Sequence, residues 1–231
     1  MRRATLIFAL ALPTLVTWVY FVALEGGSPA IQQGAYAVGK TIQFAWPLLW
    51  LIGNRPRWSR VSSRGFWAAI AFGAAIAGLM LAAYLLVFAN SDAFREPIAA
   101  VRAKTADLGL DSPAKFIALS VFYALGHAFL EEYYWRWFVF GRLCRDEHQP
   151  LSLGPAIAIS SLGFAAHHVL LLARFFGWLN PLTYVLSLSV AIGGGVWAWF
   201  YDRDRSLLSV WLSHALIDAA IFAIGFAMLF R

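Results

Sequence analysis

Ionisable side chains occur inside three long apolar segments of this sequence, and they are of types that move protons or bind metals. In chain order they are His127, Glu131, Glu132 and Arg136, then His167 and His168, then His214 and Asp218. His167 is turned about 100° from His168 by helical pitch, so we expect it to serve helix packing or a cavity wall. An ionisable group within a membrane span is costly unless it is paired or hydrated, so such groups are functional-site candidates by default.

The spacing of these residues suggests pairs on shared helix faces. Glu132 and Arg136 are four residues apart, so we expect them to form an ion pair inside a helix bundle. The same spacing recurs in two further pairs, His127 with Glu131 and His214 with Asp218. Each helix would therefore present a polar stripe to a shared interior.

These residue types support two kinds of hydrolysis. A carboxylate and a neutral imidazole can deprotonate water for attack on a carbonyl, while a second histidine and a neighbour stabilise the oxyanion. Alternatively, Glu131, His168 and His214 are the ligand types of a catalytic zinc with an open fourth position. The spacing does not choose between them, because the sequence has neither a His-Glu-x-x-His helix nor a cysteine ligand pattern.

The composition shows what must position these residues. Of the 231 residues, 61% are apolar and 13% are charged, against about 25% charged in soluble domains. This composition excludes a soluble globule, and the many aromatic residues exclude a disordered chain. The single cysteine excludes an intrachain disulfide framework. The formal charge of +6 comes from residues in short gaps between apolar runs, so we expect membrane lipids and no nucleic acid as partners.

The apolar runs predict an all-α, polytopic membrane helix bundle with seven or eight transmembrane helices in a single domain, 1–231. The first run is too long for a signal peptide, so we expect it to be retained as a span. The seven runs cover residues 5–24, 35–52, 66–89, 113–140, 151–173, 181–201 and 206–230.

The connections between the runs predict the orientation. With the N-terminus placed in the cytoplasm, the loops on the cytoplasmic side hold more Lys and Arg than the loops on the other side. Cytoplasmic loops generally carry this excess, so we expect this orientation in the cytoplasmic (inner) membrane. The one long connection, 90–112, has apolar residues near helical spacing, so we expect an amphipathic segment along the membrane surface.

Three motifs together resemble the CPBP family, which includes the CAAX prenyl endopeptidases and bacteriocin-processing membrane proteases and is related to the eukaryotic Ras-converting endopeptidase. They are Glu131-Glu132-x-x-x-Arg136, Phe164-x-x-x-His168 and His214-x-x-x-Asp218, in that order. A glycine triplet at 193–195 and the approach to His214 are also similar to the family, and the motif-bearing core spans 115–220.

The resemblance implies a role for each motif residue. Glu131 and His168 would activate the water, and His214 with Asp218 would form the oxyanion site. Glu132 and Arg136 would support them. Outside the motifs, His127 either supports Glu131 or bonds to a neighbouring helix. The family more often has Asn at the position of Asp218, and an ionised carboxylate cannot donate a hydrogen bond. Asp218 must therefore be protonated or must orient His214.

The sequence thus predicts an intramembrane endopeptidase acting on a membrane-associated peptide or protein. We expect a site without a cofactor, because Asp218 can support an oxyanion-binding His214 directly, and zinc is the alternative. Two other functions stay open, a non-catalytic immunity or scaffold protein and a proton-coupled transporter, although the chain shows no two homologous halves. The sequence does not indicate the oligomeric state.

Overall fold

The computed structural model describes residues 3–51, 62–89, 91, 95–110, 112–145 and 150–230. Every regular element among these residues is helical, and the all-α class predicted from composition is confirmed. The predicted cytoplasmic loop with Arg55, Arg57 and Arg60 lies outside the described residues.

Six stretches of the described helices are long and apolar enough to cross a membrane, which makes the chain an integral membrane protein. The remaining predicted span, 35–52, falls in α2 (Pro29–Leu51), a helix of 23 residues. Polar side chains lower the mean hydropathy of this helix below that of a typical span, among them Gln32, Gln33, Lys40 and Gln43. The six stretches are Ala4–Ala23, Ser63–Phe88, Pro113–Arg145, Leu153–Phe176, Pro181–Asp204 and Leu207–Phe230.

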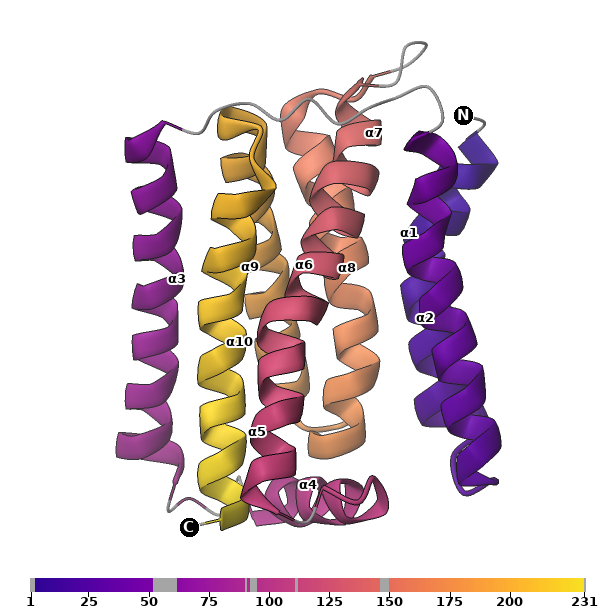
Figure 1. The fold of residues 1–231 in the computed structure, drawn as a ribbon, viewed down its shortest axis with the longest axis vertical. Helices are drawn as coiled ribbons and strands as arrows, with labels where there is room; N and C mark the ends of the chain where they lie inside the picture. Colours follow the sequence, from indigo (N-terminus) through magenta and orange to yellow (C-terminus); the bar gives the residue numbers. More distant parts are fainter. Residues whose placement is uncertain are drawn as a thin grey trace. The chain divides into compact units, whose positions relative to one another are not determined.

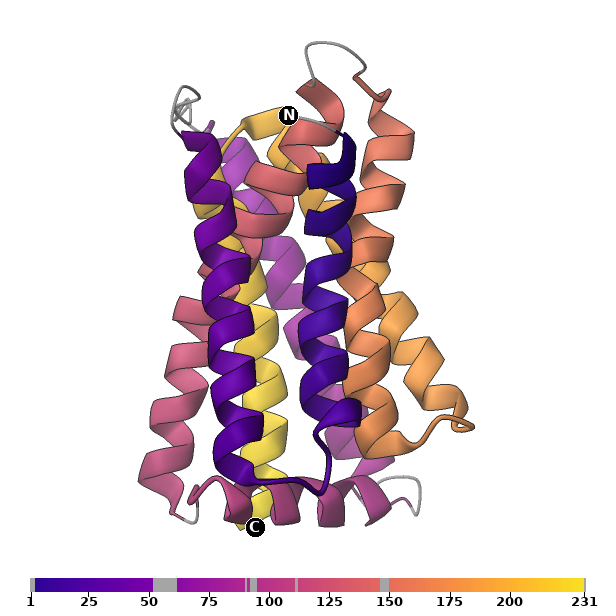
Figure 2. The same cartoon turned by 90° about the vertical axis from the view of Figure 1, so that its right-hand side faces the viewer.

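The described chain forms two compact units. The first comprises Met1–Ser59 and Tyr133–Arg205. Helix α8 packs against both α1 and α9 in this unit, and α1 and α2 form an antiparallel pair (Figure 2). Its elements are α1 (Arg3–Trp18), the π-helical stretch η1 (Val19–Ala23), α2, the π-helical stretch η5 (Tyr133–Phe140), α7 (Gly141–Arg145), α8 (Leu153–Phe176) and α9 (Pro181–Asp204).

A proline inside α1 is accommodated by a side chain from η5. Pro13 has no N–H, so the carbonyl of Ala9 loses its helical donor. The hydroxyl of Tyr134 donates to that carbonyl at 2.5 Å, and the ring of Tyr134 is fully buried. In a membrane span each backbone polar group needs an internal partner, and this bond supplies one.

The second unit comprises Arg60–Glu132 and Ser206–Arg231. Helix α10 is its centre, because it contacts α3, α4, α5, η4 and α6. Helix α4 lies across the ends of α5 and α10 (Figure 1), and Arg102 on α4 donates to the carbonyl of Met228 at 3.1 Å. The elements are α3 (Ser63–Ala83), η2 (Tyr84–Phe88), α4 (Arg95–Asp107), α5 (Pro113–Val121), η4 (Phe122–His127), α6 (Ala128–Glu132) and α10 (Leu207–Phe230).

Helix caps explain where two of the spans begin. The Ser112 hydroxyl accepts from the backbone N–H of Lys115 at 3.4 Å, directly before α5. The Asn180 side chain accepts from the N–H of Leu182 at 2.9 Å, directly before α9. Both caps precede a proline at the first helical position, where its missing N–H costs nothing.

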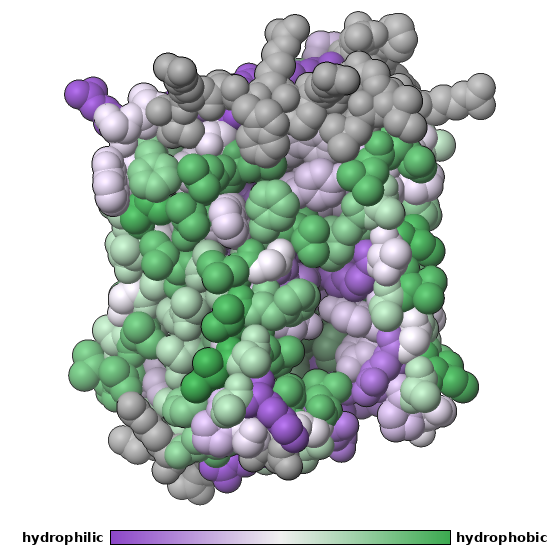
Figure 3. Space-filling model, viewed as in Figure 1, coloured by the Kyte–Doolittle hydropathy of each residue, from purple (hydrophilic) through white to green (hydrophobic). Residues whose placement is uncertain are grey.

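Apolar side chains cover much of the helical surface, as the face in Figure 3 shows. Leu86 on η2 and Leu179 before α9 are 84% and 98% exposed. Such exposure would be costly in water and is expected where helices contact lipid.

Candidate active site

Four of the predicted site residues meet in the second unit, where α6 packs against α10. The imidazole of His214 lies at the centre of this group. Its Nδ1 is 2.8 Å from Oε1 of Glu132, and its Nε2 is 3.5 Å from Oδ1 of Asp218 and 3.8 Å from Oε2 of Glu131. His214 and Glu131 are each 4% exposed and Glu132 is fully buried. Three carboxylates therefore surround one buried imidazole.

The contact between His214 and Glu132 determines where one ring proton lies. An ionised carboxylate only accepts hydrogen bonds, so Nδ1 of His214 must carry the proton and donate it to Glu132. Sequence reasoning gave Glu132 only Arg136 as a partner and missed this bond. The signal available was the second acid itself, which is turned about 100° from Glu131 on a helix and so faces a different neighbour.

A second bond holds α10 against the helix that carries the two acids. The indole N–H of Trp211 donates to the carbonyl of Leu125 at 2.8 Å. Leu125 belongs to η4, where the wider π-helical turns change the usual backbone pairing. Trp211 also packs on the ring of Phe129, with centroids 5.4 Å apart. This contact lies about one turn before His214 and fixes the level at which its ring meets α6.

His127 lies on the other side of Glu131. Its Nδ1 is 3.8 Å from Oε1 of Glu131, as the predicted spacing of four requires, and its ring packs on Tyr123 at 4.9 Å. This distance suits an electrostatic contact more than a hydrogen bond. Its position agrees with a supporting role beside Glu131.

An apolar groove of about 910 Å³ runs along the same unit. Residues of α3, η2, α5, η4 and α10 form its walls, among them Ile70, Leu85, Val121 and Phe222. Ala215, Leu216 and Ala219 of α10 also line it. Ala215 directly follows His214 in the sequence, and Ala219 directly follows Asp218. The groove therefore brings apolar surface to the helical turns that carry the site.

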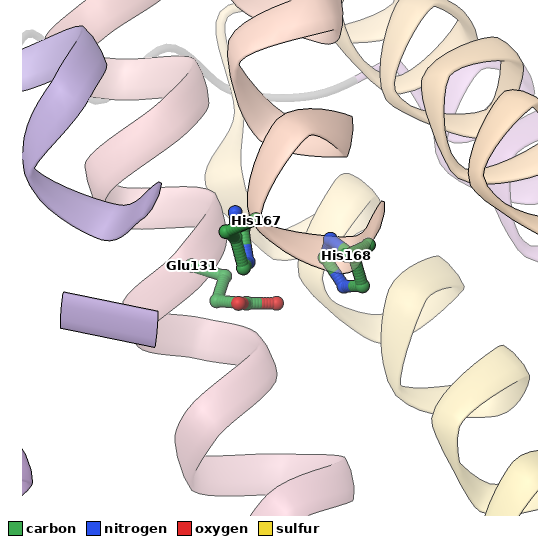
Figure 4. Close-up of side chains that lie close together, drawn as sticks. All are labelled: Glu131, His167 and His168. Carbon is green, nitrogen blue, oxygen red and sulfur yellow. The ribbon is translucent and has the colours of Figure 1, made fainter. Parts of the chain in front are cut away.

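His168 lies on α8, in the first unit (Figure 4). Its Nδ1 is 2.9 Å from the carbonyl oxygen of Phe164. A carbonyl only accepts, so Nδ1 carries the proton and a neutral ring has its lone pair on Nε2. Nε2 is therefore the nitrogen that can accept a proton or bind a metal.

His167, next to it on α8, contacts aromatic rings. Its ring is parallel to that of Trp135 within 4°, with centroids 6.2 Å apart, and lies 5.7 Å from Phe164. The side chain is 6% exposed. Helical pitch turns it about 100° away from His168, and the packing among rings agrees with a structural role.

Arg136 is buried among residues of the first unit. Its Nη2 donates to the carbonyl of Gly194 at 3.4 Å, and its guanidinium lies over Phe164 and Trp197, 4.6 and 5.1 Å from the ring centres. A Cβ at Gly194 would lie 3.2 Å from the Phe164 ring and 3.3 Å from Nη2 of Arg136. The middle glycine of the triplet at 193–195 therefore leaves room for Phe164 and Arg136.

Two of the predicted pairings stay predictions. They are the ion pair of Glu132 with Arg136 and the water-activating pair of Glu131 with His168, and each combines residues of both units.

Residues 113–220 match the family model described as type II CAAX prenyl endopeptidase, Rce1-like. This stretch, the Rce1-like region, is similar to that family. The match confirms the resemblance that the three motifs suggested over 115–220. The Rce1-like region runs from the start of α5 into α10, and it contains all the candidate site residues. No curated protein and no solved structure matches the chain.

Proposed function

We propose that this protein is an intramembrane endopeptidase that hydrolyses a peptide bond in a membrane-associated peptide or protein. The observation that carries the proposal is the group of buried Glu131, Glu132 and His214 with the partly buried Asp218 within the Rce1-like region. Placing three carboxylates around one imidazole, two of them buried and one partly buried, is costly, and a bundle held together by packing alone does not need them.

In the proposed mechanism Glu131 takes a proton from a water molecule, assisted by His168 through the lone pair on Nε2. The water oxygen bonds to the carbonyl carbon of the substrate, and the carbonyl oxygen becomes an oxyanion. His214, with Asp218 beside it, stabilises that charge. The intermediate then collapses as the C–N bond breaks, and the proton held by Glu131 passes to the amine nitrogen.

The apolar groove supports a substrate that is itself apolar. Its walls are side chains such as Val121, Leu216 and Phe222, and it adjoins the residues next to His214. Within the bilayer, the hydrophobic part of a membrane-associated substrate could replace lipid in this groove, with packing contacts as the source of its affinity.

The test replaces Glu131 by Gln, which keeps the shape of the side chain but cannot take a proton from water. We expect Glu131→Gln to fold in detergent and to lose peptide hydrolysis entirely. Comparative proteomics of membrane peptides from cells carrying wild type or Glu131→Gln would identify the substrate. The matched control is Glu25→Gln, which removes a half-exposed ion pair with Arg174 and should leave processing unchanged.

Identical peptide profiles in cells carrying wild type and Glu131→Gln would overturn the protease and favour a non-catalytic scaffold or immunity protein.

We propose that the reaction needs no metal, since His214, supported by Asp218, can stabilise the oxyanion directly. Zinc held by Glu131, His168 and His214 is the alternative. Elemental analysis of active protein distinguishes the two: we expect no stoichiometric zinc and no effect of chelators. Activity that is lost with zinc removal and regained with its return would establish the metal mechanism.

A further inference from the structure

We infer that Glu132 is the positioning residue for His214 and provides the negative charge that an oxyanion-binding imidazole requires. This inference rests on the proposed function and assigns a role to the second acid of the Glu-Glu pair. It is carried by the 2.8 Å bond between His214 Nδ1 and Glu132 Oε1, the shortest of the three carboxylate contacts of that ring.

The burial of this pair makes the bond structurally decisive. Glu132 is fully buried and His214 is 4% exposed, so bulk water does not compete for either group. A hydrogen bond in which the donor or the acceptor is ionised is about twice as strong as one between two neutral groups. The bond also joins α6 to α10, so it sets the rotation of the imidazole about its side-chain torsions.

Asp218 does not have the same relation to the ring. It lies one turn further along α10 and approaches Nε2, at 3.5 Å, which is longer than a good hydrogen bond. Glu131 approaches Nε2 too, at 3.8 Å. Nδ1 of the ring is therefore hydrogen-bonded to Glu132, whereas Nε2 faces Glu131 and Asp218, the residues proposed to act on substrate.

The bond at Nδ1 decides what Nε2 can do. If the ring carried only the proton on Nδ1, Nε2 would present a lone pair and repel an oxyanion. To donate a hydrogen bond to the oxyanion, Nε2 must carry a second proton, which makes the ring positively charged. The carboxylate of Glu132 is the hydrogen-bonded counter-charge for that ring. A neutral side chain of the same shape at position 132 would not suffice, because it would not balance the positive charge of the His214 ring.

The experiment compares Glu132→Gln with wild type, using the peptide substrate identified by proteomics and purified protein in detergent. Gln keeps the volume and can still accept from Nδ1, but it has no charge. We expect kcat to fall about 10- to 100-fold, as for other residues that orient an active imidazole, with KM unchanged. Glu132→Asp keeps the charge at a shorter reach and should be affected less than Glu132→Gln.

A spectroscopic measurement separates positioning from general stability. The Nδ1 proton of His214 should give a strongly downfield NMR resonance in histidine-labelled protein, assigned by its absence in His214→Gln. We expect this resonance to move upfield in Glu132→Gln and to stay in place in Arg136→Gln. If Glu132 acted only as the partner of Arg136, the resonance would be the same in all three proteins.

A third variant guards against a folding defect. In Glu132→Ala, which leaves a space beside Nδ1, added formate should restore part of kcat, whereas chloride at equal concentration should not. Full activity in Glu132→Gln, or a His214 resonance that does not move in this variant, would overturn the inference. Neither result would bear on the protease assignment, which Glu131→Gln tests separately. Hydrolysis that survives Glu131→Gln would instead refute the proposed function.

Discussion

At the residue scale, Asp218 is the position where this chain differs from the Asn that is commoner in the family its motifs resemble. The structure places Glu132, and not Asp218, in hydrogen-bond contact with Nδ1 of His214. We therefore predict that Asp218→Asn keeps His214 oriented and retains activity, with kcat equal to wild type or up to about 10-fold higher. The physical reason is that an amide N–H can donate to an oxyanion, whereas an ionised carboxylate cannot.

The measurement is kcat of purified Asp218→Asn on the identified peptide, with Asp218→Leu as the control that removes all polarity. A loss of 10-fold or more in Asp218→Asn would show that the carboxylate itself takes part, for instance by holding Nε2 of His214 at its 3.5 Å contact.

Spacing along the sequence predicted neighbours of these residues on the same helix, but not their partners on other helices. Spacing along one helix is local, so the neighbours of His127 and His214 at four residues could be derived from helical geometry. The bond from His214 to Glu132 joins residues 82 apart in the chain and depends on how α6 packs on α10. Nothing in the spacing of a single helix encodes that packing, so this partner could not be predicted.

At the element scale, one glycine sets how closely α3 approaches α10. A Cβ on Gly73 would lie 2.8 Å from Oγ and 2.9 Å from Cα of Ser213, the residue before His214. We predict that Gly73→Ala lowers the free energy of unfolding by about 1–3 kcal/mol, because backbone atoms of α10 cannot move aside as a flexible side chain could. Activity should fall as well, since any shift of Ser213 moves His214.

Thermal unfolding in detergent, followed together with kcat, checks this prediction. The matched control is Gly78→Ala in the same helix, where a Cβ would meet nothing within 4 Å. Ala is the better helix former by up to about 1 kcal/mol, so this variant should be neutral or slightly more stable. Equal melting temperatures for the two variants would mean that the α3–α10 contact tolerates a Cβ.

Hydropathy predicted where the helices lie, but it did not predict the π-helical stretches inside them. The predicted run 113–140 falls in the stretch Pro113–Arg145, yet this stretch alternates between α-helix and the π-helical stretches η4 and η5. These lie directly before and after α6, which carries the two acids. Apolar composition measures transfer into lipid and says nothing about the pitch of a helix, so the π-helical turns were beyond sequence reasoning.

At the scale of the whole molecule, the distribution of Lys and Arg predicts the side of the membrane on which each loop lies. Within the first unit, the start of α1 and the start of α8 lie at one end and the turn between α1 and α2 lies at the other (Figure 2). Ser28 is exposed in that turn, and Ser152 is exposed directly before α8. Since cytoplasmic loops favour basic residues, we expect Ser152 inside and Ser28 outside.

Cysteine labelling tests this orientation with closely matched variants. Cys144 is the chain's one cysteine, so Cys144→Ser gives a background in which Ser28→Cys and Ser152→Cys each introduce a single thiol of nearly the same size as the hydroxyl replaced. We predict that a membrane-impermeant maleimide labels the thiol at position 28 in intact cells and the thiol at 152 only after permeabilisation. The reverse pattern would place the N-terminus outside.

The orientation also sets the side of the membrane nearer to the site. His214 is the eighth residue of α10, roughly 10 Å from the start of that helix at 1.5 Å per residue. With the N-terminus outside, Leu207 at the start of α10 would face the outer surface. Substrates would in that case reach the site from the outer side of the membrane, so the labelling pattern also decides on which side the proposed protease meets its peptides.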